Sequence, residues 1–178
     1  MDPQLQKALA LIEEATGGVT DDQLSWHPEG KWSSANILEH LARAFSGTVK
    51  GIERTLGAGK LDCRAGTTKE QLMVLAVVRA GFFPPGRKSP PMVVPKGIPP
   101  QQAMHDIRAN LGAVDVALAE CEKKFGSGKI LQHPVLGPLT AREWRKFHYV
   151  HTRHHMKQIR NLRSRAVEGR SRAAQVRS

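Results

Sequence analysis

Residues 143–162 constrain the possible fold more than any other stretch of this chain. Four of the eight histidines fall between His148 and His155. At 3.6 residues per turn, one stripe holds Trp144, Phe147, His148, His151, His155, Ile159 and Leu162. Such a stripe is typical of a helix that packs on a core, but imidazoles stand where leucines are expected. Buried imidazoles need hydrogen-bond partners or a metal ion.

Three other segments have the apolar spacing of long helices. They span residues 3–16, 34–56 and 101–124. Thr-x-x-Glu capping boxes at Thr67 and Thr140 predict the starts of a shorter helix through Val78 and of the histidine helix. The shorter helix is apolar on all sides, which indicates deep burial or contact with another subunit.

Together these segments predict an all-α fold, a four-helix bundle with an extra short helix. The seven prolines of residues 82–100 predict a long ordered crossover between the second and third long helices. We expect the bundle to span residues 1–163. Residues 164–178 lack large apolar side chains apart from valine, and we expect them to form a basic, disordered tail.

The formal net charge of +11 raises the question of nucleic-acid binding. Residues 142–178 carry eleven Lys/Arg and two Glu, so they account for +9 of that charge. This distribution favours a solvated helix face and tail over a nucleic-acid site.

No apolar run reaches the roughly 18–20 residues of a membrane span, and no signal pattern precedes residue 20. With only Cys63 and Cys121, read as free thiols, the sequence predicts a cytoplasmic protein.

The histidine spacing indicates a metal site. His151 and His155 are four residues apart, so both can reach one ion from one helix face, while His148 and His154 offer alternatives three residues from His151. His40 is the candidate third ligand, because it faces the same side of its helix as Ile37. Gln158 and Glu39 are candidates for orienting a ligand. The competing interpretation is that these histidines are hydrogen-bonded core residues and exposed ones.

Two segments carry a resemblance to a known family. Residues 31–41, Lys-Trp-Ser-Ser-Ala-Asn-Ile-Leu-Glu-His-Leu, resemble the Trp-Ser…His-Leu segment of the DinB-like (DinB/YfiT) superfamily, whose members are regarded as metalloenzymes. Residues 133–159 are similar to the C-terminal part of a branch known as a domain of unknown function. They read His-Pro-Val-Leu-Gly-Pro-Leu-Thr-x-x-Glu-Trp-x-x-Phe-His-x-x-His-x-x-His-His-x-x-Gln-Ile.

The resemblance implies a four-helix bundle that holds a divalent nickel, zinc, iron or manganese ion on three histidines. Residue by residue, these carry over to His40, His151 and His155. Characterised relatives use low-molecular-weight thiols, as S-transferases or as a maleylpyruvate isomerase, and many form homodimers. His148, His154 and the proline-rich crossover depart from the simplest family pattern.

We therefore expect a metal-dependent enzyme that acts on a small molecule, with a low-molecular-weight thiol as one substrate. Residues 83–99 and 133–138 would shape its substrate pocket. A metal-dependent hydrolase is the first alternative. The second is a non-enzymatic metal-binding module whose basic tail contacts acidic partners.

Overall fold

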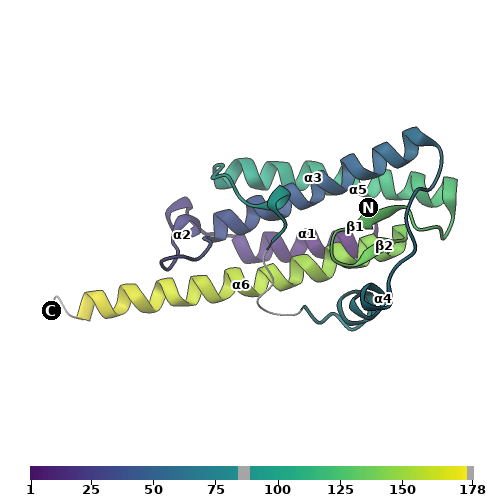
Figure 1. The fold of residues 1–178 in the computed structure, drawn as a ribbon. Coiled ribbons are helices and arrows are strands. Elements are labelled where there is room, and N and C mark those ends of the chain that lie inside the picture. The colour runs from purple at the N-terminus through teal and green to yellow at the C-terminus, as the bar shows by residue number, and fades with distance from the viewer. Residues whose placement is uncertain (84–88, 176–178) are drawn as a thin grey trace.

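Four long helices make up most of the molecule (Figure 1). The structure is a computed structural model that describes residues 1–83 and 89–175, with side chains described up to residue 166. The long helices are α1 (Pro3–Thr16), α3 (Ser34–Ala58), α5 (Pro100–Phe125) and α6 (Ala141–Gln175). The shorter elements are α2 (Asp21–Ser25), α4 (Thr68–Val74), the π turn η1 (Leu75–Arg79), the 3-10 turn η2 (Pro91–Val93), β1 (Leu131–His133) and β2 (Gly137–Leu139). The chain is thus mostly helical, as predicted, with one small hairpin.

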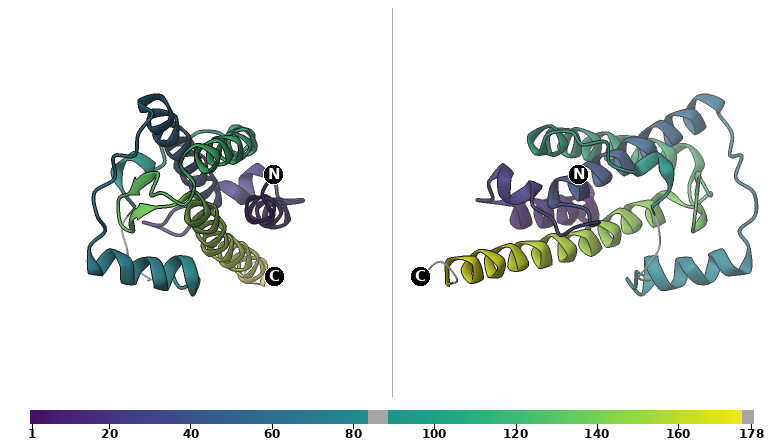
Figure 2. Two further views of the ribbon diagram at one scale, coloured as in Figure 1. Left: turned by 90° about the vertical axis from the view of Figure 1, so that its right-hand side faces the viewer. Right: turned by 60° about the vertical axis from the view of Figure 1, so that its left-hand side comes forward.

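The long helices pack in two pairs around one core. α3 lies along α5 and α1 lies along α6, while α3 and α5 also contact α6 (Figures 1 and 2). The core draws on apolar residues from all four, including Leu5, Phe45, Leu111 and Met156. This packing sets the face of α3 that carries His40 against the histidine face of α6.

Side-chain caps begin α3 and α6 where the sequence predicts. Ser33 Oγ accepts from Asn36 N at 3.1 Å at the start of α3. Thr140 and Glu143 form the reciprocal capping box of α6, with N···O distances of 2.9 and 3.2 Å. Each cap satisfies backbone N–H groups that lack a partner inside the helix. The start of the histidine helix is therefore confirmed.

The hairpin of β1 and β2 is an element that the sequence analysis did not predict. Leu131 pairs with Leu139 and His133 with Gly137. The hairpin packs closely on α3 at Gly51, where an added Cβ would lie 2.7 Å from Leu131 Cδ2. It leads directly into α6, so it fixes where the histidine helix begins.

The short helix after Thr67 is confirmed, and it continues as the π turn η1. α4 stands apart from the long helices, whereas η1 contacts α6 (Figures 1 and 2). Val77 and Val78 are buried, but Leu72 and Leu75 are 62 % and 55 % exposed in the single chain. Deep burial within one chain therefore does not account for its apolar character, and a subunit contact stays a prediction.

The proline-rich crossover and the C-terminal segment bear on two further expectations. The described parts of the crossover are irregular apart from η2, and residues 84–88 lie outside the described residues. α6 continues to Gln175, past the boundary expected at residue 163, so the division into bundle and tail stays a prediction.

Over the described residues, none of the helices combines the length and apolar character needed to cross a membrane.

Candidate metal centre

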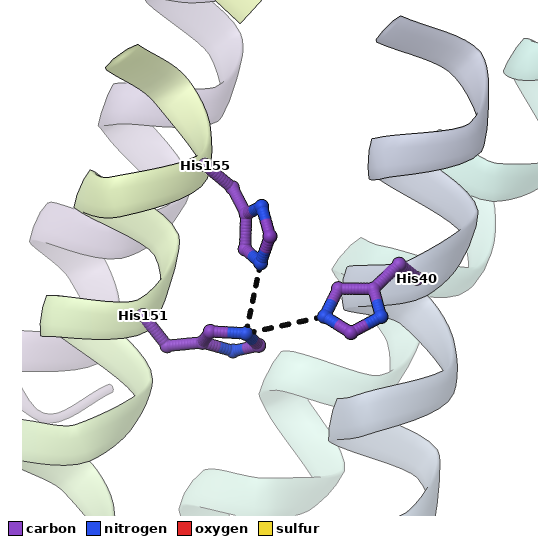
Figure 3. A group of neighbouring side chains, drawn as sticks. All are labelled: His40, His151 and His155. Atoms are coloured by element: carbon purple, nitrogen blue, oxygen red, sulfur yellow. Dashed lines mark hydrogen bonds between the residues drawn. The ribbon is translucent and has the colours of Figure 1, made fainter. Parts of the chain in front are cut away.

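Three buried histidines converge between α3 and α6 (Figure 3). His151 Nε2 lies 3.2 Å from His40 Nε2 and 2.9 Å from His155 Nε2. One ring nitrogen from each residue lies within 4.8 Å of the others. The side chains are 3 %, 6 % and 7 % exposed for His40, His151 and His155. The structure thus brings together the three histidines that the sequence analysis proposes as ligands; metal binding by them stays a prediction.

Hydrogen bonds at the far side of two rings determine where their protons lie. His40 Nδ1 is 2.9 Å from the Val93 carbonyl oxygen, and His155 Nδ1 is 2.8 Å from Gln158 Oε1. Both oxygens can only accept, so each Nδ1 carries the hydrogen in the neutral ring. The Nε2 atoms of His40 and His155 are then bare lone pairs, and both point at His151.

His151 cannot satisfy both neighbours by hydrogen bonding. Its Nε2 can hold one hydrogen and donate it to one lone pair only. Its buried Nδ1 has no hydrogen-bond partner among the described residues. Lone pairs gathered in a buried space are unfavourable without a cation between them, so a metal ion fits this arrangement better than a network of core histidines does.

All three imidazoles are held in the neutral form, which is the form that binds metals. Burial lowers the pKa of His40, an effect that the hydrogen bond to Val93 partly opposes. Burial, followed by the neighbouring His40, lowers the pKa of His155 to about 3. Burial, followed by the neighbouring His155 and His40, holds the pKa of His151 well below its ordinary value.

Two of the three nitrogen–nitrogen distances suit a common ion. Two nitrogens about 2.05 Å from one metal, seen at about 90–110°, lie about 2.9–3.4 Å apart. The distances of 2.9 and 3.2 Å from His151 Nε2 fall in this interval. Neutral imidazole donors favour zinc, nickel, copper or iron over calcium and magnesium, which prefer oxygen. Three ligands also leave coordination positions for water or substrate.

Aromatic rings surround the three histidines. Phe147 stacks on His151 with ring centroids 5.2 Å apart, and Phe83 stacks on the same ring at 5.6 Å. Trp32 lies 5.3 Å from the ring of His40. The crossover therefore contributes Phe83 to the rings around the histidines. That residues 83–99 shape a substrate pocket stays a prediction.

The remaining histidines lie outside this group. His148 is fully buried among the rings of Phe45, Trp144 and Phe147, and burial lowers its pKa to about 3. His154 is half-buried, stacks on Phe83 and accepts from Gln158 Nε2 at 3.1 Å. Of the alternatives to His155, neither joins the convergence.

His27 and His105 are exposed, whereas the hairpin holds His133. Its Nδ1 accepts from the backbone N–H groups of Val135 and Leu136 at 3.1 and 3.0 Å. Its ring packs on Phe147 with centroids 4.5 Å apart. His133 thus borders the aromatic wall without joining the three histidines.

The two groups expected to orient ligands behave differently. Gln158 bridges His155 and His154, so it fixes the ring of one candidate ligand. Glu39 contacts no ligand ring and instead accepts from backbone N–H groups of the crossover. The Val93 carbonyl orients His40 in its place. Sequence reasoning missed this contact, because a backbone carbonyl has no residue-type signal.

Comparison with known proteins adds the family. A family model described as "Protein of unknown function (DUF1569)" matches residues 10–162. The chain belongs to the DUF1569 family. The matched residues of this DUF1569 protein include all three converging histidines. Searches of curated proteins and of solved structures gave no significant match.

Proposed function

We propose that this DUF1569 protein is a divalent-metal-dependent enzyme of the DinB-like superfamily, with α1, α3, α5 and α6 as its four-helix bundle. The single observation that carries the proposal is the convergence of three neutral imidazoles whose lone pairs face one another. Hydrogen-bonded core histidines would place a donor opposite each lone pair, and here His151 has only one hydrogen for two of them.

The substrate we propose is a low-molecular-weight thiol that is transferred to a small electrophile. A divalent metal bound to the three histidines would act as a Lewis acid and lower the pKa of a thiol or water, yielding a nucleophile near neutral pH. Val93 and Gln158 fix the rings of His40 and His155. Phe83, Phe147 and Trp32 limit access of bulk water. The thiol preference rests on the resemblance to the superfamily, and hydrolysis of a small substrate by the same site is the alternative reaction.

A second candidate is a non-enzymatic module in which the metal stabilises the fold and the basic segment contacts acidic partners. Two observations favour it. The three histidines are almost completely buried, and two surface hollows, of about 710 and 490 Å³, are lined by other residues. Both proposals include a homodimer and a cytoplasmic location. The proposed location rests on the free thiols Cys63 and Cys121.

Cobalt substitution separates these candidates. The purified protein is analysed for bound metals, stripped, loaded with Co²⁺ and titrated with a small thiol such as 2-mercaptoethanol. The enzyme proposal expects one Co²⁺ per chain and a saturable sulfur-to-cobalt absorption band. The Co²⁺ form is also titrated with azide, a small anionic ligand. A Co²⁺ spectrum that changes with neither thiol nor azide would favour the structural module. A wild-type protein that binds no transition metal would contradict both.

A further inference from the structure

The carboxylate of Glu39 holds part of the crossover against α3. It accepts hydrogen bonds from three successive backbone N–H groups, those of Lys96, Gly97 and Ile98, at 2.7, 2.8 and 3.1 Å. Glu39 is only 1 % exposed. Gly97 has φ of +89°, a conformation that favours glycine and that turns neighbouring N–H groups toward one point.

The same stretch of α3 holds the preceding residues of the crossover. His40 Nδ1 donates to the Val93 carbonyl at 2.9 Å, and Arg43 Nη2 donates to the Met92 carbonyl at 3.0 Å. We call residues 92–98 the strap. The strap is thus attached to Glu39, His40 and Arg43, which all lie in one five-residue stretch of α3. One of these residues, His40, is a converging histidine.

Hydrogen bonds rather than apolar burial hold most of the strap. Met92 is 67 % exposed and Val94 is 41 % exposed, while Ile98 packs against the core at the far end. Hydrogen bonds to a carboxylate are about twice as strong as those between neutral groups. Without them, the Val93 carbonyl would be kept beside His40 only by its own hydrogen bond and by that of Arg43 to Met92.

We propose that Glu39 is a positioning residue of the metal centre that acts through the strap. By fixing the strap, Glu39 keeps the Val93 carbonyl on His40 Nδ1, which leaves the Nε2 lone pair directed at His151 and His155. Metal binding and the order of the strap are then coupled, and by linkage each favours the other. This inference rests on the proposed metal site and adds the element that organises it.

Two variants test the route through the strap. Glu39→Gln keeps the shape of the side chain but replaces one acceptor oxygen by an NH₂ group that faces backbone donors. Gly97→Ala leaves Glu39 and every histidine intact, and its added Cβ meets open space, so it acts only through the strained φ. Gly112→Ala in α5 is the matched control, because its Cβ also meets open space and its φ is not positive.

The measurement is the affinity of the full chain for Zn²⁺, by competition with a chromophoric chelator, with circular dichroism as the check of folding. We expect Glu39→Gln and Gly97→Ala to weaken binding by about 10-fold or more, the range for loss of groups that orient ligands. Gly112→Ala should bind as wild type. In wild type, Zn²⁺ should also slow amide hydrogen exchange at residues 96–98.

The outcomes separate the two proposals. A wild type that binds no Zn²⁺ overturns the metal site itself. If wild type binds Zn²⁺ and both strap variants bind it as tightly as wild type does, the strap inference is wrong. A loss confined to Glu39→Gln would point to a direct charge effect and overturn the route through the strap. If Glu39→Gln does not fold, Gly97→Ala decides alone.

Discussion

His151 is the side chain on which the three-histidine group depends most. Its Nε2 faces the Nε2 atoms of both other rings, whereas His40 and His155 meet only edge to face, with ring centroids 4.8 Å apart. Phe147 and Phe83 also both stack on its ring. Loss of His151 would therefore leave two imidazoles from different helices, without the chelating pair on α6.

We expect His151→Ala to abolish metal binding and His154→Ala to preserve it. His154 is the matched control, because it lies on the same helix, stacks on the same Phe83 and uses its Nε2 to accept from Gln158. Elemental analysis of the two purified variants is the measurement. Equal metal content in both would contradict the ligand assignment.

His148 predicts a dependence of stability on pH. Burial lowers its pKa to about 3 in the folded protein, against about 6.5 in an unfolded chain. Between these values the unfolded state binds more protons, so the free energy of unfolding falls as the pH falls from about 6.5 toward 3. At pH 7 and above the contribution is complete. At pH 5 it has lost about 2 kcal/mol.

The variant His148→Leu isolates this contribution. Both proteins are unfolded with urea at pH 7 and pH 5 in the presence of a chelator, so that the titration of the other histidines is common to both. Wild type should lose about 2 kcal/mol more than the variant between the two pH values. An equal loss would mean that His148 is protonated in the folded protein without penalty.

The element that delivers two of the three histidines, α6, depends on its cap. Thr140 Oγ1 accepts from Glu143 N, and Glu143 Oε2 accepts from Thr140 N and from Lys129 Nζ. We expect Thr140→Ala to lower the free energy of unfolding by about 1 kcal/mol. Thr140→Ser keeps the acceptor and should retain most of the stability. The test is urea unfolding of the three proteins, and an unchanged Thr140→Ala would contradict a role for the cap.

Helix starts were predictable because the caps are local. Ser33 with Asn36 and Thr140 with Glu143 carry their partners three residues away, so the sequence itself holds the signal. The hairpin was not predictable from strand patterns, since each strand has three residues and one contains Pro138. Contacts distant in sequence hold it, such as Thr55 Oγ1 to the Ile130 carbonyl at 3.0 Å.

The candidate site likewise has a part that the sequence predicts and a part that it does not. The spacing of His151 and His155 places them on one helix face whatever the rest of the chain does. The inward side of His40 followed from its position between Ile37 and Ala44. The Val93 carbonyl and the attachment of Glu39 to the strap depend on backbone more than fifty residues away, and no residue pattern encodes them.

At the scale of the whole molecule, the metal would join two helix pairs. His40 belongs to the α3–α5 pair, and His151 and His155 belong to α6, which packs with α1. A ligand that binds only the folded state raises stability by mass action. We expect free Zn²⁺ at 100 times its dissociation constant to raise the free energy of unfolding by about 2.7 kcal/mol.

Urea unfolding with and without Zn²⁺ measures this effect, and His151→Ala serves as the control that should show none. A rise of similar size in the variant would indicate that Zn²⁺ acts elsewhere on the chain.

The separation of His40 from His151 has a consequence for how the protein would acquire the proposed ion. The two residues are 111 positions apart. A nascent chain that has been synthesised only as far as α5 presents His40 without its partners, and one imidazole is a weak ligand. We therefore expect the proposed metal to be captured only after α6 has been synthesised and has docked, and we expect a chain truncated before His151 to bind it poorly.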